Sequence, residues 1–345
     1  MSCYHPVKAW MRICVPCVYN YIDETSIVRN LYITRKEMTF LVANSRKLIF
    51  NPKFKTEAQR EYFMQHHKEV SLPCGKCIGC RIQRARSWAA RCWHEAQFYE
   101  HNCFLTLTYA PEHLPRGKHG KCILRVSDYQ SFMKRFRTYL DRHHDHTKVR
   151  FFHCGEFGSK RGRSHYHSLI FGFDFPDKEF YKFNKLGQPL YRSPTLDKLW
   201  GKGICIIGEV TYQSAGYVAR YCIKKEYGNK SDRGPGRSEY ITMSNRPGIG
   251  YRWFNKFKHQ LLSVGFVLVP GKDKNWIKSE IPTYYMRKLK NDLHFMEEYD
   301  SFVYRKQCRA ASRYEEYTEE RLQVKEAVLL SRLGQLKREF ENESE

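Results

Sequence analysis

The sequence predicts an α+β fold in which a central antiparallel sheet carries flanking helices. Three observations predict it. The chain has 345 residues, 41% of them hydrophobic, so it can bury a full core. Strand-like and helix-like stretches alternate between residues 101 and 228. The middle two strand candidates are joined by a short loop, which favours antiparallel pairing because a parallel pair needs a long crossover.

The first predicted strand and helix of this region follow one another after residue 100. CFLTLTY (103–109) has the β-branched and aromatic content of a strand. SDYQSFMKRFRTYL (127–140) predicts a helix, because apolar residues recur in it at helical intervals. Ser127 and Gln130 have the spacing of a capping box, so we expect this helix to begin at Ser127.

The next elements complete the order strand, helix, strand, strand, insertion, strand, helix. VRFFHCGEF (149–157) and HYHSLIFGF (165–173) predict a hairpin, joined by the basic loop GSKRGRS (158–164). After an insertion, GKGICIIGEV (201–210) predicts another strand. TYQSAGYVARYCIKK (211–225) then has helical spacing.

Composition shifts predict four segments. They are a Cys-rich N-terminal segment with a helix striped by Trp88, Cys92, Ala96 and Tyr99 (1–100), a domain of alternating strands and helices (101–228), a basic and aromatic extension (229–283) and a charged helical tail (284–345). In the tail, one helical face carries Leu322, Leu329, Leu333, Leu336 and Phe340. This face either packs on its own domain or binds a partner.

The net charge indicates a polyanionic partner. The chain has 60 Lys and Arg against 36 Asp and Glu, a formal charge of +24. Such an excess favours nucleic acid first and an anionic membrane second. No apolar run approaches the ~18 residues of a spanning helix, and the N-terminus lacks the pattern of a signal peptide. We therefore expect a cytoplasmic protein whose 13 cysteines are thiols or metal ligands rather than disulfides.

Two histidines interrupt the second hairpin strand. His165 and His167 flank Tyr166, and alternate strand residues point to one face, so both imidazoles can bind one metal ion. The pattern alone also fits structural or surface histidines, since His144 and His146 repeat it. Glu156 on the preceding strand adds a carboxylate. Two imidazoles and a carboxylate favour a site for Mg²⁺ or Mn²⁺ that polarises a phosphoryl oxygen.

Two tyrosines lie on one face of the last predicted helix. Tyr217 and Tyr221 are four residues apart, and each is followed three residues later by a cation, Arg220 and Lys224. A phenol needs nearby positive charge to become a nucleophile at neutral pH. The alternative is that both aromatic rings simply pack on the sheet.

Three cysteines recur at three-residue spacing in PCGKCIGC (73–80). Cys74, Cys77 and Cys80 suit a structural zinc site, and free thiols or an iron–sulfur cluster are the alternatives. The fourth ligand is not determined by spacing. Its candidates are Cys3, His5, Cys14, Cys17 and Cys92, of which we choose Cys3.

Basic residues mixed with aromatic ones predict DNA contacts. RIQRARSWAARCW (81–93) and FMKRFRTYL (132–140) offer phosphate contacts and stacking faces, and the loop SKRGRS (159–164) is the preferred contact near the histidine pair. The alternative for each helix is a solvated cationic face. No GxxxxGK[ST] loop is present, because the GK pairs at 75, 117, 120, 201 and 271 lack a following Ser or Thr.

Three motifs follow one another along the chain: an apolar strand, the histidine pair and the paired tyrosines. FLTLTY (104–109), HYH (165–167) and YVARYCIKK (217–225) resemble the motif set of rolling-circle replication initiators of the HUH endonuclease superfamily. The paired tyrosines further resemble the initiators of microviruses, and PCGKCIGC is most similar to the gokushovirus branch. The resemblance spans about residues 72–228, roughly half of the chain.

The resemblance implies roles for the motif residues. His165 and His167 hold the metal, with Glu156 as the third ligand; Tyr217 and Tyr221 are the nucleophiles. Lys224 matches an assisting lysine, and Arg220 is only an analogous cation.

The implied activity is the nicking of origin DNA by tyrosine transesterification. It leaves a 5′-phosphotyrosine, and rejoining releases circular single-stranded DNA in a bacterial host. The implied partners are single-stranded and origin duplex DNA, together with a host helicase and replication proteins. A relaxase or transposase of the same superfamily is one alternative, and a non-catalytic zinc-containing nucleic-acid-binding protein is another.

Overall fold

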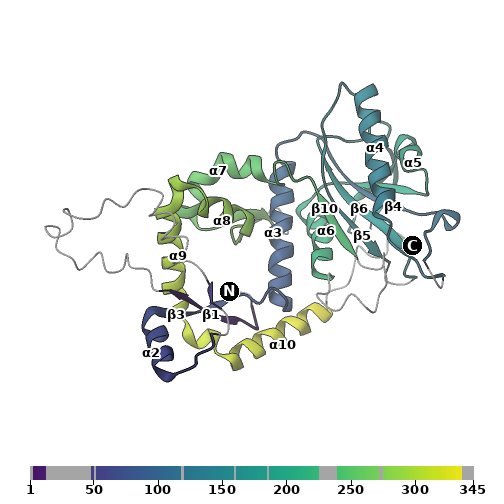
Figure 1. The fold of residues 1–345 in the computed structure, drawn as a ribbon. Coiled ribbons are helices and arrows are strands. Elements are labelled where there is room, and N and C mark those ends of the chain that lie inside the picture. The colour runs from purple at the N-terminus through teal and green to yellow at the C-terminus, as the bar shows by residue number, and fades with distance from the viewer. Residues whose placement is uncertain are drawn as a thin grey trace. The chain divides into compact units, whose positions relative to one another are not determined.

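The computed structural model describes residues 3–12, 48–49, 52–117, 120–158, 161–184, 186–224, 239–271 and 275–335 (Figure 1). The chain divides into two compact units, Met1–Cys80 and Arg81–Glu345. The finer division that the sequence predicts, with boundaries near residues 100, 228 and 283, stays a prediction.

The first unit, to which sequence reasoning assigned no fold, contains a small antiparallel sheet of order β2-β1-β3. Its elements are β1 (Val7–Arg12), β2 (Leu48–Ile49), α2 (Glu57–His66) and β3 (His67–Leu72). Helix α2 begins where the Thr56 side chain accepts a hydrogen bond from the backbone of Gln59, an ordinary N-cap. The Phe63 ring on this helix lies 5.1 Å from that of Phe54 and 6.3 Å from that of Trp10.

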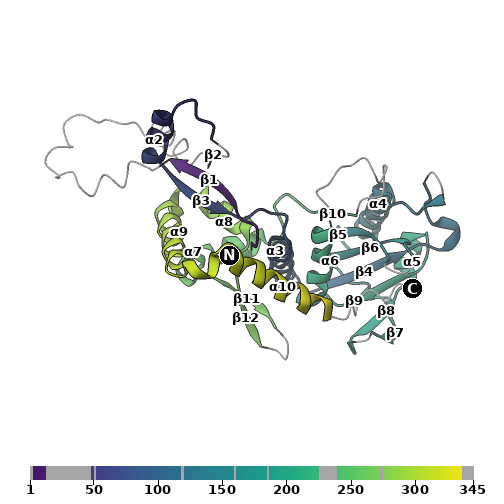
Figure 2. The same ribbon diagram turned by 90° about the horizontal axis from the view of Figure 1, so that it is seen from below.

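The second unit is built on a seven-stranded sheet of order β10-β5-β6-β4-β9-β8-β7, in which every neighbouring pair is antiparallel (Figure 2). Its strands are β4 (Asn102–Thr108), β5 (Arg150–Phe157), β6 (Ser164–Phe171), β7 (Glu179–Phe183), β8 (Pro189–Arg192), β9 (Cys205–Gly208) and β10 (Tyr240–Met243). The helices on this sheet are α3 (Ile78–Ala96), α4 (Val126–His143), α5 (Pro194–Trp200) and α6 (Tyr212–Lys224). The predicted antiparallel α+β fold and its element order are confirmed, and the insertion contains β7, β8 and α5.

Each face of the sheet is covered by its own pair of helices. Strand residues alternate between the faces, so Leu105 and Tyr166 join a core with α4 and α5. Phe104 and Leu169 join a second core with α3 and α6. The α3 stripe predicted from sequence belongs to this second core, although Tyr99 follows the end of the helix. The histidines of β6 point to this second face, because they alternate with Tyr166.

The capping box predicted at Ser127 and Gln130 is wrong, because the N-cap of this helix lies two residues before Ser127. Ser127 lies inside the first turn of α4, and the N-cap is Arg125, whose side chain makes no capping hydrogen bond. The Tyr166 hydroxyl instead donates to the backbone oxygen of Arg125, at 2.9 Å, and lies 3.2 Å from its backbone nitrogen. A buried tyrosine from β6 therefore sets where α4 begins, which local spacing could not reveal.

The remainder of the second unit packs a third core against α3. Ala90 of α3 contacts a cluster that includes Phe254, Leu261 and Tyr285. Its elements are α7 (Tyr251–Val264), β11 (Val267–Pro270), β12 (Trp276–Ser279), α8 (Thr283–Lys290), α9 (Met296–Ala311) and α10 (Glu319–Gln335), with short 3₁₀ turns at Leu293–Phe295 and Tyr314–Tyr317. A further 3₁₀ turn, Pro111–His113, lies between β4 and α4. The predicted helical C-terminal extension is therefore confirmed.

The leucine face of the tail is only partly described. Leu322 is buried, while Leu336 and Phe340 lie outside the described residues, so its two interpretations stay open. Among the described helices, none combines the length and apolarity needed to cross a bilayer.

Candidate active site and metal centre

Strand register brings the predicted metal ligands together. Glu156 of β5 is directly opposite His165 of β6, and β4 on the other side places Thr106 opposite His167. Directly opposed residues of an antiparallel pair have Cβ atoms only about 4.5–5.5 Å apart. The ligand atoms of Glu156, His165 and His167 consequently lie within 4.8 Å of one another.

One carboxylate oxygen is the centre of this group. Glu156 Oε1 lies 2.5 Å from His165 Nε2 and 2.8 Å from His167 Nε2. Glu156 Oε2 is buried and has no hydrogen-bond partner among the described residues. Burial opposes ionisation of Glu156, but the attraction of His167 and hydrogen bonds from both imidazoles prevail and lower its pKa to about 2. The site therefore contains a buried carboxylate anion.

The far nitrogen of each imidazole has its own partner. His165 Nδ1 lies 3.2 Å from the carbonyl oxygen of Arg163, and His167 Nδ1 lies 3.0 Å from Thr106 Oγ1. A carbonyl only accepts, so His165 Nδ1 donates to it. The Nε2 atom that faces the carboxylate then donates in the protonated form of the ring and carries a lone pair in the neutral form. Partners of this kind orient metal-binding histidines. Sequence reasoning missed Thr106; its signal is a polar residue within the apolar strand FLTLTY.

Helix α6 places one of the two predicted nucleophiles against this group. The Tyr217 hydroxyl donates to Glu156 Oε1 at 3.2 Å and lies 3.5 Å from His167 Nε2. Its ring meets the His167 ring edge-on at 5.0 Å, and the Arg220 guanidinium lies 5.2 Å from its centroid. Burial and the charge of Glu156 raise the pKa of Tyr217, and Arg220 opposes the increase. Tyr221 and Lys224 belong to α6, but their side chains lie outside the described part.

All four residues at this centre are nearly inaccessible to solvent. Their exposed fractions are 2% for Glu156, 5% for His165, 4% for His167 and 4% for Tyr217. Low exposure strengthens electrostatic interactions, because water screens them less.

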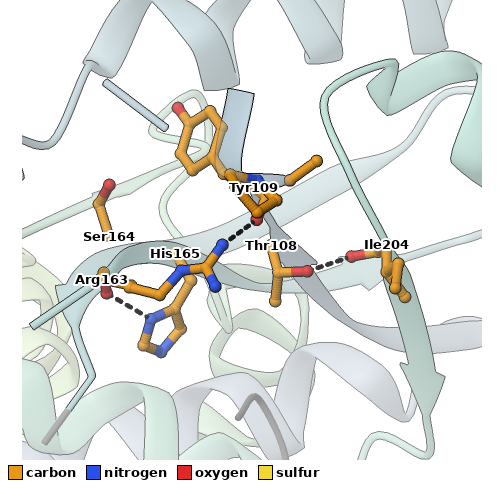
Figure 3. A pocket seen from close by; sticks show the side chains of 8 residues that line it. Thr108, Tyr109, Arg163, Ser164, His165 and Ile204 are labelled. Atoms are coloured by element: carbon orange, nitrogen blue, oxygen red, sulfur yellow. Dashed lines mark hydrogen bonds between the residues drawn. The ribbon is translucent and has the colours of Figure 1, made fainter. Parts of the chain in front are cut away.

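A pocket opens beside His165 at the ends of three strands (Figure 3). It has a volume of about 260 Å³, with Thr108, Arg163 and Ile204 among its lining residues. Arg163 donates to the backbone oxygen of Tyr109 at 2.6 Å, and Thr108 Oγ1 donates to the backbone oxygen of Ile204 at 2.6 Å. These hydrogen bonds hold the Arg163 cation and the apolar Ile204 next to the candidate metal ligands.

The first unit contains a second cluster of ligand atoms. The sulfur atoms of Cys3, Cys74, Cys77 and Cys80 lie within 4.8 Å of one another, and all four are free thiols. Backbone N–H groups of Cys74 and Tyr4 point at the sulfurs of Cys3 and Cys77, at 3.2 and 3.4 Å. Burial raises the pKa of Cys77, but backbone hydrogen bonds outweigh it and lower the pKa to about 6. A thiolate at neutral pH is the form that binds metal.

The fold places Cys3 with the three closely spaced cysteines. Cys92, a competing candidate, is buried in the core between α3 and the sheet. Cys14 and Cys17 lie outside the described residues. Cys3 is the candidate chosen from the sequence, but spacing alone did not determine it, because 71 residues separate it from Cys74.

The predicted basic segments have different surroundings. On α3, Arg91 is buried, donates to the backbone oxygen of Ile249 at 2.9 Å and lies over the Trp88 ring at 3.9 Å, so it supports packing. In the SKRGRS loop, residues 159 and 160 lie outside the described part, and Arg163 faces the pocket.

Comparison with known proteins identifies related chains. The family model for replication-associated proteins of the ORF2 type matches residues 102–226. Replication-associated protein VP4 of Bdellovibrio phage phiMH2K is 36% identical over 241 residues, which cover 68% of this chain and 72% of the relative. Replication-associated protein ORF2 of Spiroplasma virus 4 is 34% identical over 224 residues, 64% of this chain and 68% of the relative.

A third relative covers a smaller share. Replication-associated protein ORF4 of Chlamydia phage 1 is 32% identical over 241 residues, 68% of this chain and 57% of the relative. No solved structure matches the chain. The level of identity and the share of the first two relatives that is covered establish that the chain belongs to the family of replication-associated proteins of microvirus-like phages.

Proposed function

We propose that this protein initiates rolling-circle replication by nicking one DNA strand through metal-dependent tyrosine transesterification. The observation that supports the proposal best is the meeting of the Tyr217 hydroxyl with the ligand atoms of Glu156, His165 and His167 on one sheet face. The phage relatives, all named as replication-associated, favour this role over that of a relaxase or transposase.

The chemistry of the donor set fits a divalent cation. His165 Nε2 presents a lone pair to a carboxylate oxygen at 2.5 Å, which is favourable only with a proton or a cation between the two atoms. Glu156 Oε2 is a second buried oxygen with no partner among the described residues. Two imidazoles and one carboxylate would hold Mg²⁺ or Mn²⁺ and leave coordination positions open. The bound ion would supply Lewis-acid polarisation of a phosphoryl oxygen.

The residues of the chain supply the nucleophile and its positioning. Tyr217 Oη attacks the scissile phosphorus as its proton leaves, and Glu156 Oε1 is an acceptor within 3.2 Å. The new bond joins the tyrosine oxygen to the 5′ phosphate, and the broken bond releases the 3′ oxygen, which takes up a proton. Arg220 lies over the Tyr217 ring, where its charge favours the phenolate. The adjacent pocket, with Arg163 and Ile204, would hold a nucleotide next to this phosphate.

One phosphoester replaces another, so the strand is rejoined without ATP. The free 3′-OH attacks the phosphotyrosine, restores the phosphodiester and releases the tyrosine. Because the sequence has no Walker-type loop, duplex unwinding falls to a host helicase. In this proposal the protein acts on single-stranded and origin duplex DNA with host replication proteins, in the cytoplasm of the bacterial host.

Covalent capture of DNA tests this function. The protein is incubated with single-stranded fragments tiled over the genome that encodes it, with Mn²⁺ or Mg²⁺, and the products are separated on a denaturing gel. We expect a protein–DNA adduct with one fragment, lost when chelator is added. Strong DNA binding without an adduct on any fragment, with either ion, would instead support a non-catalytic binding protein.

We further propose that Cys3, Cys74, Cys77 and Cys80 hold a structural zinc ion. Four sulfur donors with backbone N–H groups pointing at them suit a closed tetrahedral site. Such an ion would stabilise a small unit that has only a three-stranded sheet and one helix in its described part.

The Cys77→Ser variant tests this zinc site. We expect the purified variant to lose its zinc and to melt roughly 10 °C lower, because metal binding contributes directly to folding in small domains. Elemental analysis and thermal denaturation measure the two effects. The matched control is Cys308→Ser, since Cys308 is an exposed free thiol. A parent protein that contains neither zinc nor iron would establish free thiols instead.

A further inference from the structure

A second concave surface lies between α4 and α5. This α4–α5 groove has a volume of about 540 Å³, and its lining includes Lys134, Arg135 and Arg142 of α4 and Lys198 of α5. Both helices pack on the sheet face that carries Leu105 and Leu107, whereas Tyr217 and the metal ligands belong to the other face. The groove is therefore separate from the proposed catalytic centre.

The groove is positively charged, and its described lining contains no carboxylate. Lys134, Arg142 and Lys198 are exposed, and none of them forms an ion pair within the described residues. The neighbouring acids have other partners: Asp141 lies 3.5 Å from His146, and Asp197 lies 2.7 Å from Arg192. The three cations are thus available for an anionic ligand.

Arg135 fixes the shape of the groove. Its guanidinium donates to the backbone oxygens of Leu199 at 2.8 Å and Trp200 at 3.1 Å, at the end of α5. This contact ties α5 to α4 and sets the position of Lys198 relative to the α4 cations. Along α4, Lys134 and Arg142 are eight residues apart and therefore about 12 Å apart on one helical face. The cations of α4 and α5 therefore lie in a row, and the contact between the two helices fixes their positions.

The ligand that suits this row of cations is a phosphate backbone whose bases are not exposed. Sites for single-stranded DNA combine cations with free aromatic faces on which bases stack. Tyr139 in this groove is only partly exposed; its ring contacts those of His143 and His144, and its hydroxyl bonds His144 at 3.0 Å. The groove therefore offers charge without a free stacking platform, as expected for a duplex whose bases are already paired.

We propose that the α4–α5 groove binds the phosphate backbone of duplex DNA that flanks the nicking site. This inference rests on the proposed function, because that function makes origin DNA the substrate. The groove contributes affinity without reading sequence, and it holds the flanking duplex on the sheet face opposite the one where the cleaved strand meets Tyr217.

The test compares the parent with the variant K134Q/R142Q/K198Q, which removes charge without adding any. The matched control is R305Q/K306Q/R309Q, because these three cations are exposed on α9 and lose the same charge. Affinities for a short duplex and for one of its strands are measured over a range of salt concentrations. Single-turnover nicking of a short single-stranded substrate is measured at saturating enzyme.

For the groove variant, we expect the slope of log affinity against log salt for the duplex to flatten by about 2 to 3, close to one per lost phosphate contact. The R142Q single variant should flatten it by about 1. Single-strand affinity and nicking should stay near parental values, and the α9 control should have little effect.

Three outcomes would overturn the inference: unchanged duplex binding by the groove variant, an equal loss in the α9 control, or an equal loss for the single strand. The first two would assign the groove no special role, and the third would make it a single-strand track. Failure of the proposed function can be told apart from failure of this inference. If the parent protein nicks no DNA, the proposed function fails, but the binding measurements still show whether the groove binds duplex DNA.

Discussion

The His167→Ala variant is expected to lose DNA nicking by at least about 100-fold while its fold and most of its DNA affinity persist. Removing a residue that only orients a metal ligand lowers metal affinity or activity by about 10- to 100-fold. His167 would be a ligand itself, so its removal should cost at least as much. Its Nε2 lies 2.8 Å from Glu156 Oε1 and 3.5 Å from the Tyr217 hydroxyl. DNA affinity should persist because phosphate binding is spread over many cations.

Adduct formation on the cleaved fragment measures this loss, and circular dichroism checks the fold. His165→Ala should behave like His167→Ala, and chelator should reproduce both. Glu156→Ala should be milder, because water can fill a vacated coordination position, and added Mn²⁺ should partly restore it. The matched control is His146→Ala, since His146 belongs to the other His-x-His pair and its side chain is 77% exposed. Undiminished nicking by the double variant H165A/H167A would remove the metal hypothesis.

The double variant Y217F/Y221F is expected to form no covalent adduct, whereas each single phenylalanine variant retains some single-nick activity. Residues at i and i+4 of a helix lie about 6 Å apart, so either hydroxyl can reach one phosphate after a modest shift. Phenylalanine keeps the Tyr217 ring, which packs edge-on against His167 and Phe104, and removes only the hydroxyl. The fold should therefore persist in all three variants.

The single variants should differ from the parent in repeated rounds. Synthesis regenerates the origin while the first tyrosine is still esterified to the old 5′ end, so a second tyrosine must make the next cut. The 3′-OH that this cut frees then attacks the first phosphotyrosine and closes the circle. We expect Tyr217→Phe and Tyr221→Phe each to release closed circles at least about 100-fold more slowly than the parent. A loss of this size is typical when an enzyme loses a group that acts only in the transition state.

Replication of an origin-bearing circle with purified host proteins measures this release, and the matched control is Tyr212→Phe, on the same helix. Parental circle production by either single variant would show that the two tyrosines do not alternate. The tyrosine that was substituted would then have only a packing role.

Local spacing was sufficient to predict which residues of the candidate site share one face. A period of two places His165 and His167 on one side of a strand, and a helical period of 3.6 places Tyr217 and Tyr221 on one side of a helix. Short loops predicted the β5–β6 hairpin, and the structure pairs Glu156 with His165 as that hairpin requires. Each of these inferences depends on residues that are close in sequence, where chain geometry leaves few alternatives.

Other features depended on contacts between distant segments. The start of α4 is set by Tyr166, which is 41 residues away, and the Thr106 partner of His167 is 61 residues away. Strand β10, from the segment predicted as an extension, pairs with β5 at the sheet edge. No local period encodes such pairings, because they form only when strands and helices bury their apolar faces together.

The amino-acid sequence was enough to predict the type of fold, the residues of the candidate metal site and the paired tyrosines, and its net charge of +24 favours a polyanionic partner. Three features follow from tertiary contacts: the cluster of Cys3, which the sequence only preferred, with the three closely spaced cysteines, the burial of Arg91, and the groove that Lys198 of α5 lines together with the α4 cations. The physical reason is that side-chain spacing along one strand or helix follows from backbone geometry. The meeting of separate elements follows from how the whole chain packs its core.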